Sequence, residues 1–210
     1  MIRVKICGIT NRDDAMAAVD AGADLIGFIF APSPRQVDRA TAARIIAGVG
    51  TEVTTVGVFV DAQVDDIQKA YEECGIAIAQ LHGQESPETV EALGAGRVWK
   101  AFRIRDESDL EGISSYGADL AGVFLDAYSR DRAGGTGQTF DWRLAAKAPR
   151  NGVPLILAGG LTPANVGAAI AQAQPDIVDV SSGVESSPGR KDVQLVRSFI
   201  RAARAASAIL

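Results

Sequence analysis

Histidine and cysteine are scarce in this sequence of 210 residues, which contains one histidine, His82, and two cysteines, Cys7 and Cys74. A single histidine argues against a metal site built from imidazoles, and the cysteines lack metal-ligand spacing. Two cysteines are also too few for the disulfide framework that is typical of oxidising compartments. We therefore expect a cytoplasmic protein with no bound metal and no cofactor.

Long apolar runs and an excess of basic residues are absent as well. The longest apolar runs, residues 25–32 and 55–60, are far too short to span a bilayer, and the first residues lack the architecture of a signal peptide. The net charge of −5 argues against nonspecific nucleic-acid binding. We expect neither a nucleic-acid nor a membrane partner. Monomer and homodimer stay open, since the expected outer helices show no long apolar seam.

The sequence does contain a regular series of short apolar runs rich in β-branched residues. These runs alternate with helix-like segments, which is typical of βα units and a parallel sheet. The predicted strands are residues 4–7, 25–30, 54–60, 78–82, 98–103, 120–126, 154–158 and 177–181.

Helix start and stop signals lie between these runs. Thr10 is expected to cap a first helix that ends at Gly22. Further helix starts are predicted at Asp61, at Ser86-Pro87-Glu88 and at Thr162-Pro163, and a last helix over residues 193–208.

Eight βα units within 210 residues predict an α/β protein, a compact (β/α)8 TIM barrel that occupies residues 1–210 as a single domain. No linker or low-complexity stretch divides the chain. The alternative is an open doubly wound sheet, but no Gly-x-Gly-x-x-Gly pattern follows the first predicted strand. The barrel is therefore the better prediction.

In such a barrel the functional residues lie at the C-terminal ends of the strands. These ends carry a thiol, carboxylates, arginines, an imidazole and two glycine-rich turns. In chain order they are Cys7, Arg35, Asp61, Gln80 with His82, Arg103, Asp126, Gly159 with Gly160, and Ser181 with Ser182 and Gly183. Together on one rim, these residue types predict a ligand site.

Cys7 ends the first predicted strand, just before a glycine and a helix start. The positive end of a helix dipole would favour its thiolate, which makes Cys7 a candidate base or nucleophile. The alternative is a small buried hydrophobic residue, as most free cysteines are.

Asp126 ends an otherwise apolar strand. Partial burial there would favour a neutral, proton-donating carboxyl, although aspartate is equally suited to capping a turn. The polar stretch that follows, residues 130–139 with Gly134-Gly135-Thr136-Gly137, is interpreted as a lid over the site rather than a plain connection.

The glycine-rich turns follow predicted strands seven and eight, the usual phosphate position in this fold. Backbone amides around Gly159, Gly160, Ser182 and Gly183 could hold one phosphate; otherwise these are ordinary tight turns. Arg35 lies in a loop stiffened by prolines and suits a carboxylate or phosphate, unless it is a simple surface arginine.

Lys5 and Cys7 share strand parity, so Lys5 is expected to point into the barrel below the rim. A buried lysine needs a partner, and Asp179 is the predicted one, as a structural ion pair. Gln80 and His82 also share parity and could both face the barrel mouth, although a lone histidine is more often structural.

Several of these segments match a known family in order along the chain. They are Lys5-Ile6-Cys7-Gly8-Ile9-Thr10, Gly27-Phe28-Ile29-Phe30 with Ser33-Pro34-Arg35, Gly57-Val58-Phe59-Val60, Gln80-Leu81-His82-Gly83, Gly134-Gly135-Thr136-Gly137 with Phe140-Asp141-Trp142, Ala158-Gly159-Gly160-Leu161, and residues 179–185. With them the chain resembles phosphoribosylanthranilate isomerase of tryptophan biosynthesis. One departure is the loop before Arg35, which is shorter than the family's pattern.

The resemblance implies an Amadori rearrangement of a small-molecule phosphoribosyl substrate, N-(5-phosphoribosyl)anthranilate. It implies that Asp126 is the general acid at the ring oxygen, and that Cys7 as thiolate removes the proton from sugar C2. Arg35 would then pair with the anthranilate carboxylate. The phosphate would lie on Gly159, Gly160, Ser182 and Gly183, with Gln80, His82 and Asp179 as weaker binding candidates.

Three alternatives fit less well. The related isomerase of histidine biosynthesis resembles a duplicated half-barrel with two phosphate sites and an aspartate base, whereas this chain has Cys7 and one evident phosphate site. Phosphosugar epimerases resemble metal-binding barrels with several rim histidines. A non-catalytic sensor on the same scaffold stays possible from sequence, but the presence of both Cys7 and Asp126 argues for catalysis.

Overall fold

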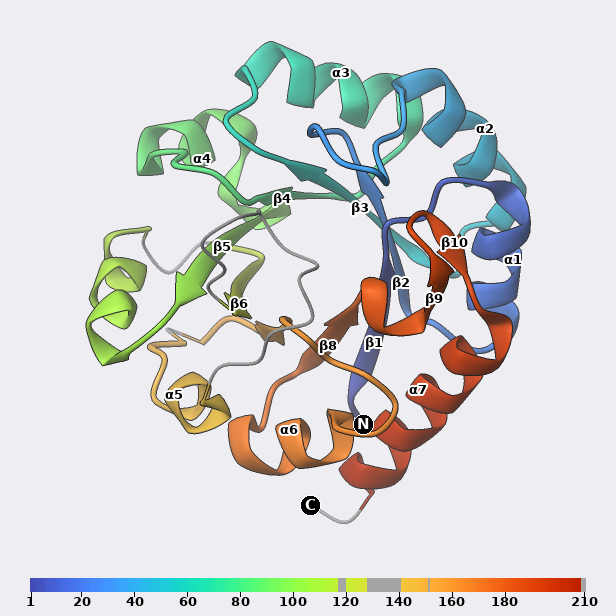
Figure 1. The fold of residues 1–210 in the computed structure, drawn as a ribbon. Coiled ribbons are helices and arrows are strands. Elements are labelled where there is room, and N and C mark those ends of the chain that lie inside the picture. Colours follow the sequence, from blue (N-terminus) through green and yellow to red (C-terminus); the bar gives the residue numbers. More distant parts are fainter. Residues whose placement is uncertain (117–119, 128–140, 151, 209–210) are drawn as a thin grey trace.

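Eight parallel strands close into a barrel in the computed structural model, which describes residues 1–116, 120–127, 141–150 and 152–208. In Figure 1 the strands form a central ring with the helices around it. The strands are β1 (Arg3–Cys7), β2 (Leu25–Ile29), β3 (Thr54–Phe59), β4 (Ile78–Leu81), β5 (Val98–Ile104), β6 (Gly122–Ala127), β7 (Leu155–Leu157) and β8 (Ile177–Val180). Each predicted run overlaps one strand to within a few residues at each end, and the predicted TIM barrel is confirmed.

The helices follow the strands in sequence and cover the outside of the barrel (Figure 1). They are α1 (Arg12–Asp20), α2 (Arg39–Val49), α3 (Val64–Cys74), α4 (Pro87–Leu93), α5 (Trp142–Ala146), α6 (Val166–Ala173) and α7 (Val193–Ser207). Shorter 3-10 segments are η1 (Ala95–Arg97), η2 (Glu107–Tyr116) and η3 (Ser182–Val184). Between β5 and β6 the described residues thus form the 3-10 segment η2 in place of an α-helix.

The barrel closes because β1 pairs with both β2 and β8, with Lys5 opposite Leu25 on one side and Asp179 on the other. The helix ring closes in the same region, since α7 packs against both α6 and α1. The last helix buries Val196, Phe199 and Ile200, as its spacing predicts.

Two hydrophobic layers hold the strands. The larger lies between strands and helices, and the smaller fills the barrel interior below the rim with Leu25, Val56, Trp99, Phe124, Ile156 and Ile177. Strands buried on both faces explain why the apolar runs are nearly continuous. Above the interior layer the inward positions turn polar, with Lys5, Gln80 and Asp179 all buried.

The two helices that were predicted to start at a threonine begin after an asparagine instead. Asn11, not Thr10, caps α1 by accepting the Asp14 amide at 2.9 Å, while the Thr10 hydroxyl donates to the Gly189 carbonyl at 2.6 Å. At the other site Thr162-Pro163 forms a turn and α6 begins after Asn165. Asn11 is as good a cap as the predicted threonine. The Asn165 side chain instead accepts the Thr162 amide at 2.7 Å and makes no cap bond to α6.

The starts predicted at Asp61 and Ser86 have different outcomes. Asp61 has a φ of 50° and accepts the Gln84 amide, and α3 begins three residues later after Gln63. Ser86 precedes α4 with Pro87 in the first helical turn, as predicted. Among the described residues, no helix is both long and apolar enough to cross a bilayer.

A hairpin follows β8 and crosses back over the rim toward β1 and α1 (Figure 1). Its strands are β9 (Glu185–Ser187) and β10 (Arg190–Lys191). The backbone amide of Lys191 donates to the Asp14 carboxylate at 2.9 Å, which ties the hairpin to α1. The hairpin carries two charged side chains into the region of Arg35.

Candidate active site

A cavity of about 810 Å³, counted with its open mouth, lies at the C-terminal ends of the strands. All ten predicted site residues line it: Cys7, Arg35, Gln80, His82, Asp126, Gly159, Gly160, Asp179, Ser182 and Gly183. They come from strands β1, β4, β6 and β8 and from the segments after β2, β4, β7 and β8.

Two other rim residues lie outside this cavity. Asp61 is bound to the Gln84 amide, and Arg103 lines a neighbouring pocket and donates to the His82 carbonyl at 3.2 Å. The predicted lid, residues 130–139, lies outside the described residues.

Asp126 lies at the end of β6 and is buried, at 4 % exposure. Its Oδ2 is 3.3 Å from His82 Nε2, and the His82 ring packs edge-on against Phe124. The two side chains thus share one wall of the cavity, and the carboxyl faces the ligand space with an imidazole beside it.

The orientation of His82 is set by a chain of polar contacts. Lys5 Nζ donates to Gln80 Oε1 at 3.0 Å, which fixes the Gln80 amide so that its nitrogen faces His82 Nδ1 at 3.2 Å. Since the amide nitrogen is a donor, Nδ1 accepts and the ring proton of a neutral His82 lies on Nε2, toward Asp126. Gln80 therefore holds the His82 ring in this orientation.

Cys7 lies at the end of β1 and is 5 % exposed. The sequence predicted that a helix dipole would favour the Cys7 thiolate, and this prediction is wrong. Burial raises the pKa of the Cys7 thiol, the Lys5 ammonium lowers it, and the Asp179 carboxylate raises it further. α1 begins only at Arg12, and the causes that act on the pKa of Cys7 are burial first and the neighbouring charged side chains second.

Lys5 is fully buried and pairs with Asp179, Nζ to Oδ1 at 3.0 Å. The predicted ion pair below the rim is confirmed. Burial raises the pKa of the Asp179 carboxyl, and the Lys5 ammonium lowers it.

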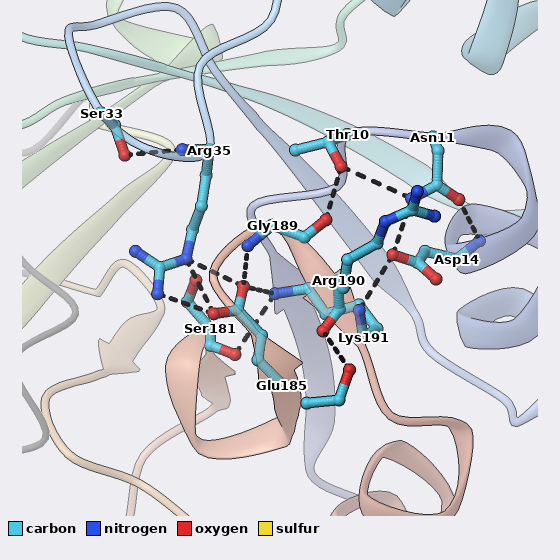
Figure 2. A network of polar contacts seen from close by, with 11 residues as sticks. Thr10, Asn11, Asp14, Ser33, Arg35, Ser181, Glu185, Gly189, Arg190 and Lys191 are labelled. Carbon is cyan, nitrogen blue, oxygen red and sulfur yellow. Dashed lines mark hydrogen bonds and ion pairs between the residues drawn. The ribbon is translucent and has the colours of Figure 1, made fainter.

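Arg35 is held by a partner that sequence reasoning missed. Its Nε and Nη2 donate to the Glu185 carboxylate at 2.8 and 2.7 Å, and Lys191 Nζ reaches the same carboxylate at 2.8 Å. Figure 2 shows Glu185 between the two cations. Burial raises the pKa of Glu185, but the Arg35 and Lys191 contacts outweigh it, so that the pKa is lowered overall. The one sequence signal was that Glu185 ends a family-matching segment.

The glycine turns after β7 and β8 touch each other. A Cβ on Gly183 would collide with the backbone carbonyl of Leu161, so only glycine allows the two turns to meet. Gly159 and Gly160 both have positive φ, at 92° and 63°. Such turns expose backbone amides to the cavity, which suits an anion.

We expect Gly183→Ala to push these turns apart. Stability should fall by about 1–3 kcal/mol, because the added methyl meets rigid backbone, and the KM for a phosphorylated substrate should rise about tenfold or more. Urea denaturation and steady-state kinetics measure the two effects. Gly167→Ala on α6 is the matched control, since its Cβ would meet nothing nearer than 3.7 Å. An unchanged KM in Gly183→Ala would contradict the phosphate role.

Comparison with known proteins decides the family. A family model described as N-(5'phosphoribosyl)anthranilate (PRA) isomerase matches residues 4–202. The chain belongs to this isomerase family. The N-(5'-phosphoribosyl)anthranilate isomerase of Geobacter sulfurreducens is 51 % identical over 205 residues, which are 97 % of this chain and 99 % of the relative.

Solved isomerase structures have the same fold. The phosphoribosyl anthranilate isomerase of Thermotoga maritima superposes with a TM-score of 0.90 at 39 % identity, covering 98 % of this chain and 100 % of the other. A second isomerase structure, in complex with reduced 1-(o-carboxyphenylamino)-1-deoxyribulose 5-phosphate, superposes with a TM-score of 0.85 at 37 % identity and the same coverage.

Proposed function

We propose that this chain catalyses the Amadori rearrangement of N-(5'-phosphoribosyl)anthranilate in tryptophan biosynthesis by general acid–base catalysis. The observation that carries the proposal is that Cys7 and Asp126 line one cavity from the non-adjacent strands β1 and β6. Membership of the isomerase family supports the substrate and the reaction. A base and an acid in one cavity are what this reaction needs.

In the proposed mechanism Asp126 gives its proton to the furanose ring oxygen. The bond between C1 and that oxygen breaks, and the nitrogen lone pair forms an iminium at C1. The Cys7 thiolate then takes the proton from C2, and the electron pair of that bond makes the enol-amine. Protonation at C1 and loss of the enol proton give the ketone. At this point Asp126 has lost a proton and Cys7 has gained one, and proton exchange with solvent restores the acid and the thiolate before the next turnover.

The rest of the cavity binds the two ends of the substrate in this proposal. Amides around Gly159, Gly160, Ser182 and Gly183 hold the phosphate. Arg35 binds the anthranilate carboxylate through Nη1 and the outer edge of its guanidinium, because Glu185 occupies Nε and the inner edge. Gln80, His82 and Asp179 line the floor and wall between these ends.

Glu185 should therefore control how well Arg35 binds substrate. Glu185→Gln removes a charge-assisted pair of hydrogen bonds, typically worth about 1.5–3 kcal/mol, so the KM should rise about 10- to 100-fold with a smaller change in kcat. Steady-state kinetics measure this. Glu73→Gln is the control, since Glu73 binds Arg39 at 2.7 Å in an exposed pair. Equal kinetics in both variants would contradict the role of Glu185.

One assay tests the activity itself. Mixing the protein with N-(5'-phosphoribosyl)anthranilate should consume the fluorescence of the anthranilate conjugate with turnover far above the protein concentration. Loss of no more than one equivalent of substrate signal would instead favour the non-catalytic sensor.

The domain organisation and the cellular location are proposed as well. We propose one catalytic domain over residues 1–210, supported by the pairing of β1 with β8, and a cytoplasmic location. One Thermotoga maritima relative is described as a monomer made from a dimeric isomerase. For this chain sedimentation decides between monomer and homodimer.

A further inference from the structure

The ammonium of Lys5 lies beneath the thiol of Cys7, in the polar layer between the hydrophobic interior and the cavity. It is fully buried and uses two of its three N–H donors on Asp179 Oδ1 and Gln80 Oε1, each at 3.0 Å. The third N–H group of Lys5 is not used by Asp179 or Gln80. The Phe124 ring lies 5.6 Å from Nζ and closes the lower side.

Gly27 makes the approach of the two side chains possible. Gly27 pairs with Cys7 in the register of β1 and β2. A Cβ on Gly27 would lie 2.8 Å from Cys7 Sγ, closer than real Cβ contacts allow, and in a tight contact of 3.1 Å with Lys5 Nζ. The thiol and the ammonium therefore meet over the one position on β2 that has no side chain.

We propose that Lys5 is a positioning residue whose ammonium stabilises the Cys7 thiolate, and that Asp179 limits this effect by sharing the same charge. The proposal rests on Cys7 acting as the base under the proposed function. Opposite charge favours an ionised group and like charge disfavours it. The two members of the Lys5–Asp179 pair therefore act on the thiolate in opposite directions.

Other charged groups around Cys7 leave the opposite effects of Lys5 and Asp179 on the thiolate in place. Lys191 on β10 and Arg35 after β2 both interact electrostatically with the thiolate, and both are held by Glu185. His82 and Asp126 act on Asp179 from the far side. Among the charged groups that act on Cys7, Lys5 and Asp179 have the largest effects of each sign, and they are bound to each other.

The test titrates Cys7 without substrate, in a Cys74→Ala background that leaves Cys7 as the one thiol. Thiolate absorbance and the rate of alkylation by iodoacetamide, each measured as a function of pH, give the midpoint of the Cys7 titration. Lys5→Met should move the midpoint to higher pH by about one unit or more, and Asp179→Asn should move it to lower pH. A purely structural ion pair would shift both variants in the same direction or neither. Either of those results would overturn the proposal.

A double variant covers the case in which Lys5→Met fails to fold because Asp179 is left buried and unpaired. Lys5→Met with Asp179→Asn has no such charge, and its midpoint should lie above that of Asp179→Asn alone. Equal midpoints would overturn the proposal. The proposed function fails separately, if Cys7→Ala keeps full turnover while the titration shifts appear as stated.

Discussion

Cys7→Ala is expected to lower kcat by about 10²- to 10⁴-fold, because the variant loses the group that takes the C2 proton. Burial raises the pKa of Cys7 in the free protein, and the Lys5 ammonium opposes this. A raised pKa makes the thiolate, once it is formed, a stronger base for the C2 proton. Steady-state kinetics with the fluorescent substrate measure the loss.

Two further cysteine variants separate the base from general damage. Cys74→Ala removes the other buried thiol, which donates to the Arg39 carbonyl at 3.4 Å on the outside of the barrel, and should leave kcat unchanged. Cys7→Asp restores a base with a lower pKa, so its activity should extend to lower pH than in the original protein. Near-normal turnover in Cys7→Ala would rule out Cys7 as the base.

Asp126→Asn is expected to cost about 10²- to 10⁴-fold in kcat as well, because an amide keeps the shape of the carboxyl but has no acid proton. The ring oxygen then leaves unprotonated, and ring opening becomes the slow step. The KM should change much less, since the proposed phosphate and carboxylate contacts lie elsewhere.

Asp61→Asn is the matched control for this variant. Asp61 is a second aspartate at the same rim, after β3, but it lies outside the cavity and binds the Gln84 amide. Its positive φ also suits asparagine. Similar losses of kcat in Asp61→Asn and Asp126→Asn would mean that activity depends on the negative charge of the rim in general and not on a proton from Asp126.

The barrel could be predicted from sequence because its signals are local. Each strand is an apolar run in the sequence. In the first one Lys5 and Cys7 are two residues apart, so their side chains lie on the same face. Once the fold is a (β/α)8 barrel, every strand end belongs to one rim. The predicted site residues come together for that reason, without any signal that links them directly.

Contacts made late in the chain could not be predicted in the same way. Arg35 and Glu185 are 150 positions apart, and their pairing depends on the β9–β10 hairpin crossing the rim. The hairpin itself is short and polar, so it leaves no apolar pattern to read. The cap of α1 was misplaced by one residue because Thr10 and Asn11 are both good caps.

The environment of Cys7 was the most consequential error of sequence reasoning. A thiol before a helix start suggested a thiolate favoured by the helix dipole, whereas burial raises the pKa of Cys7. The compensating charge comes from Lys5, two residues earlier and below the rim. Strand parity placed Lys5 correctly, but the open space over Gly27 is a property of the folded barrel.

The most direct measurement is a crystal structure of this protein with reduced 1-(o-carboxyphenylamino)-1-deoxyribulose 5-phosphate bound. We expect Cys7 Sγ within about 3–3.5 Å of C2, with the Asp126 carboxyl at hydrogen-bonding distance from the oxygen on C4. The phosphate should lie on the turns after β7 and β8, and the carboxylate at Arg35. A ligand bound in the reverse orientation, or with C2 beyond reach of Cys7, would contradict the account.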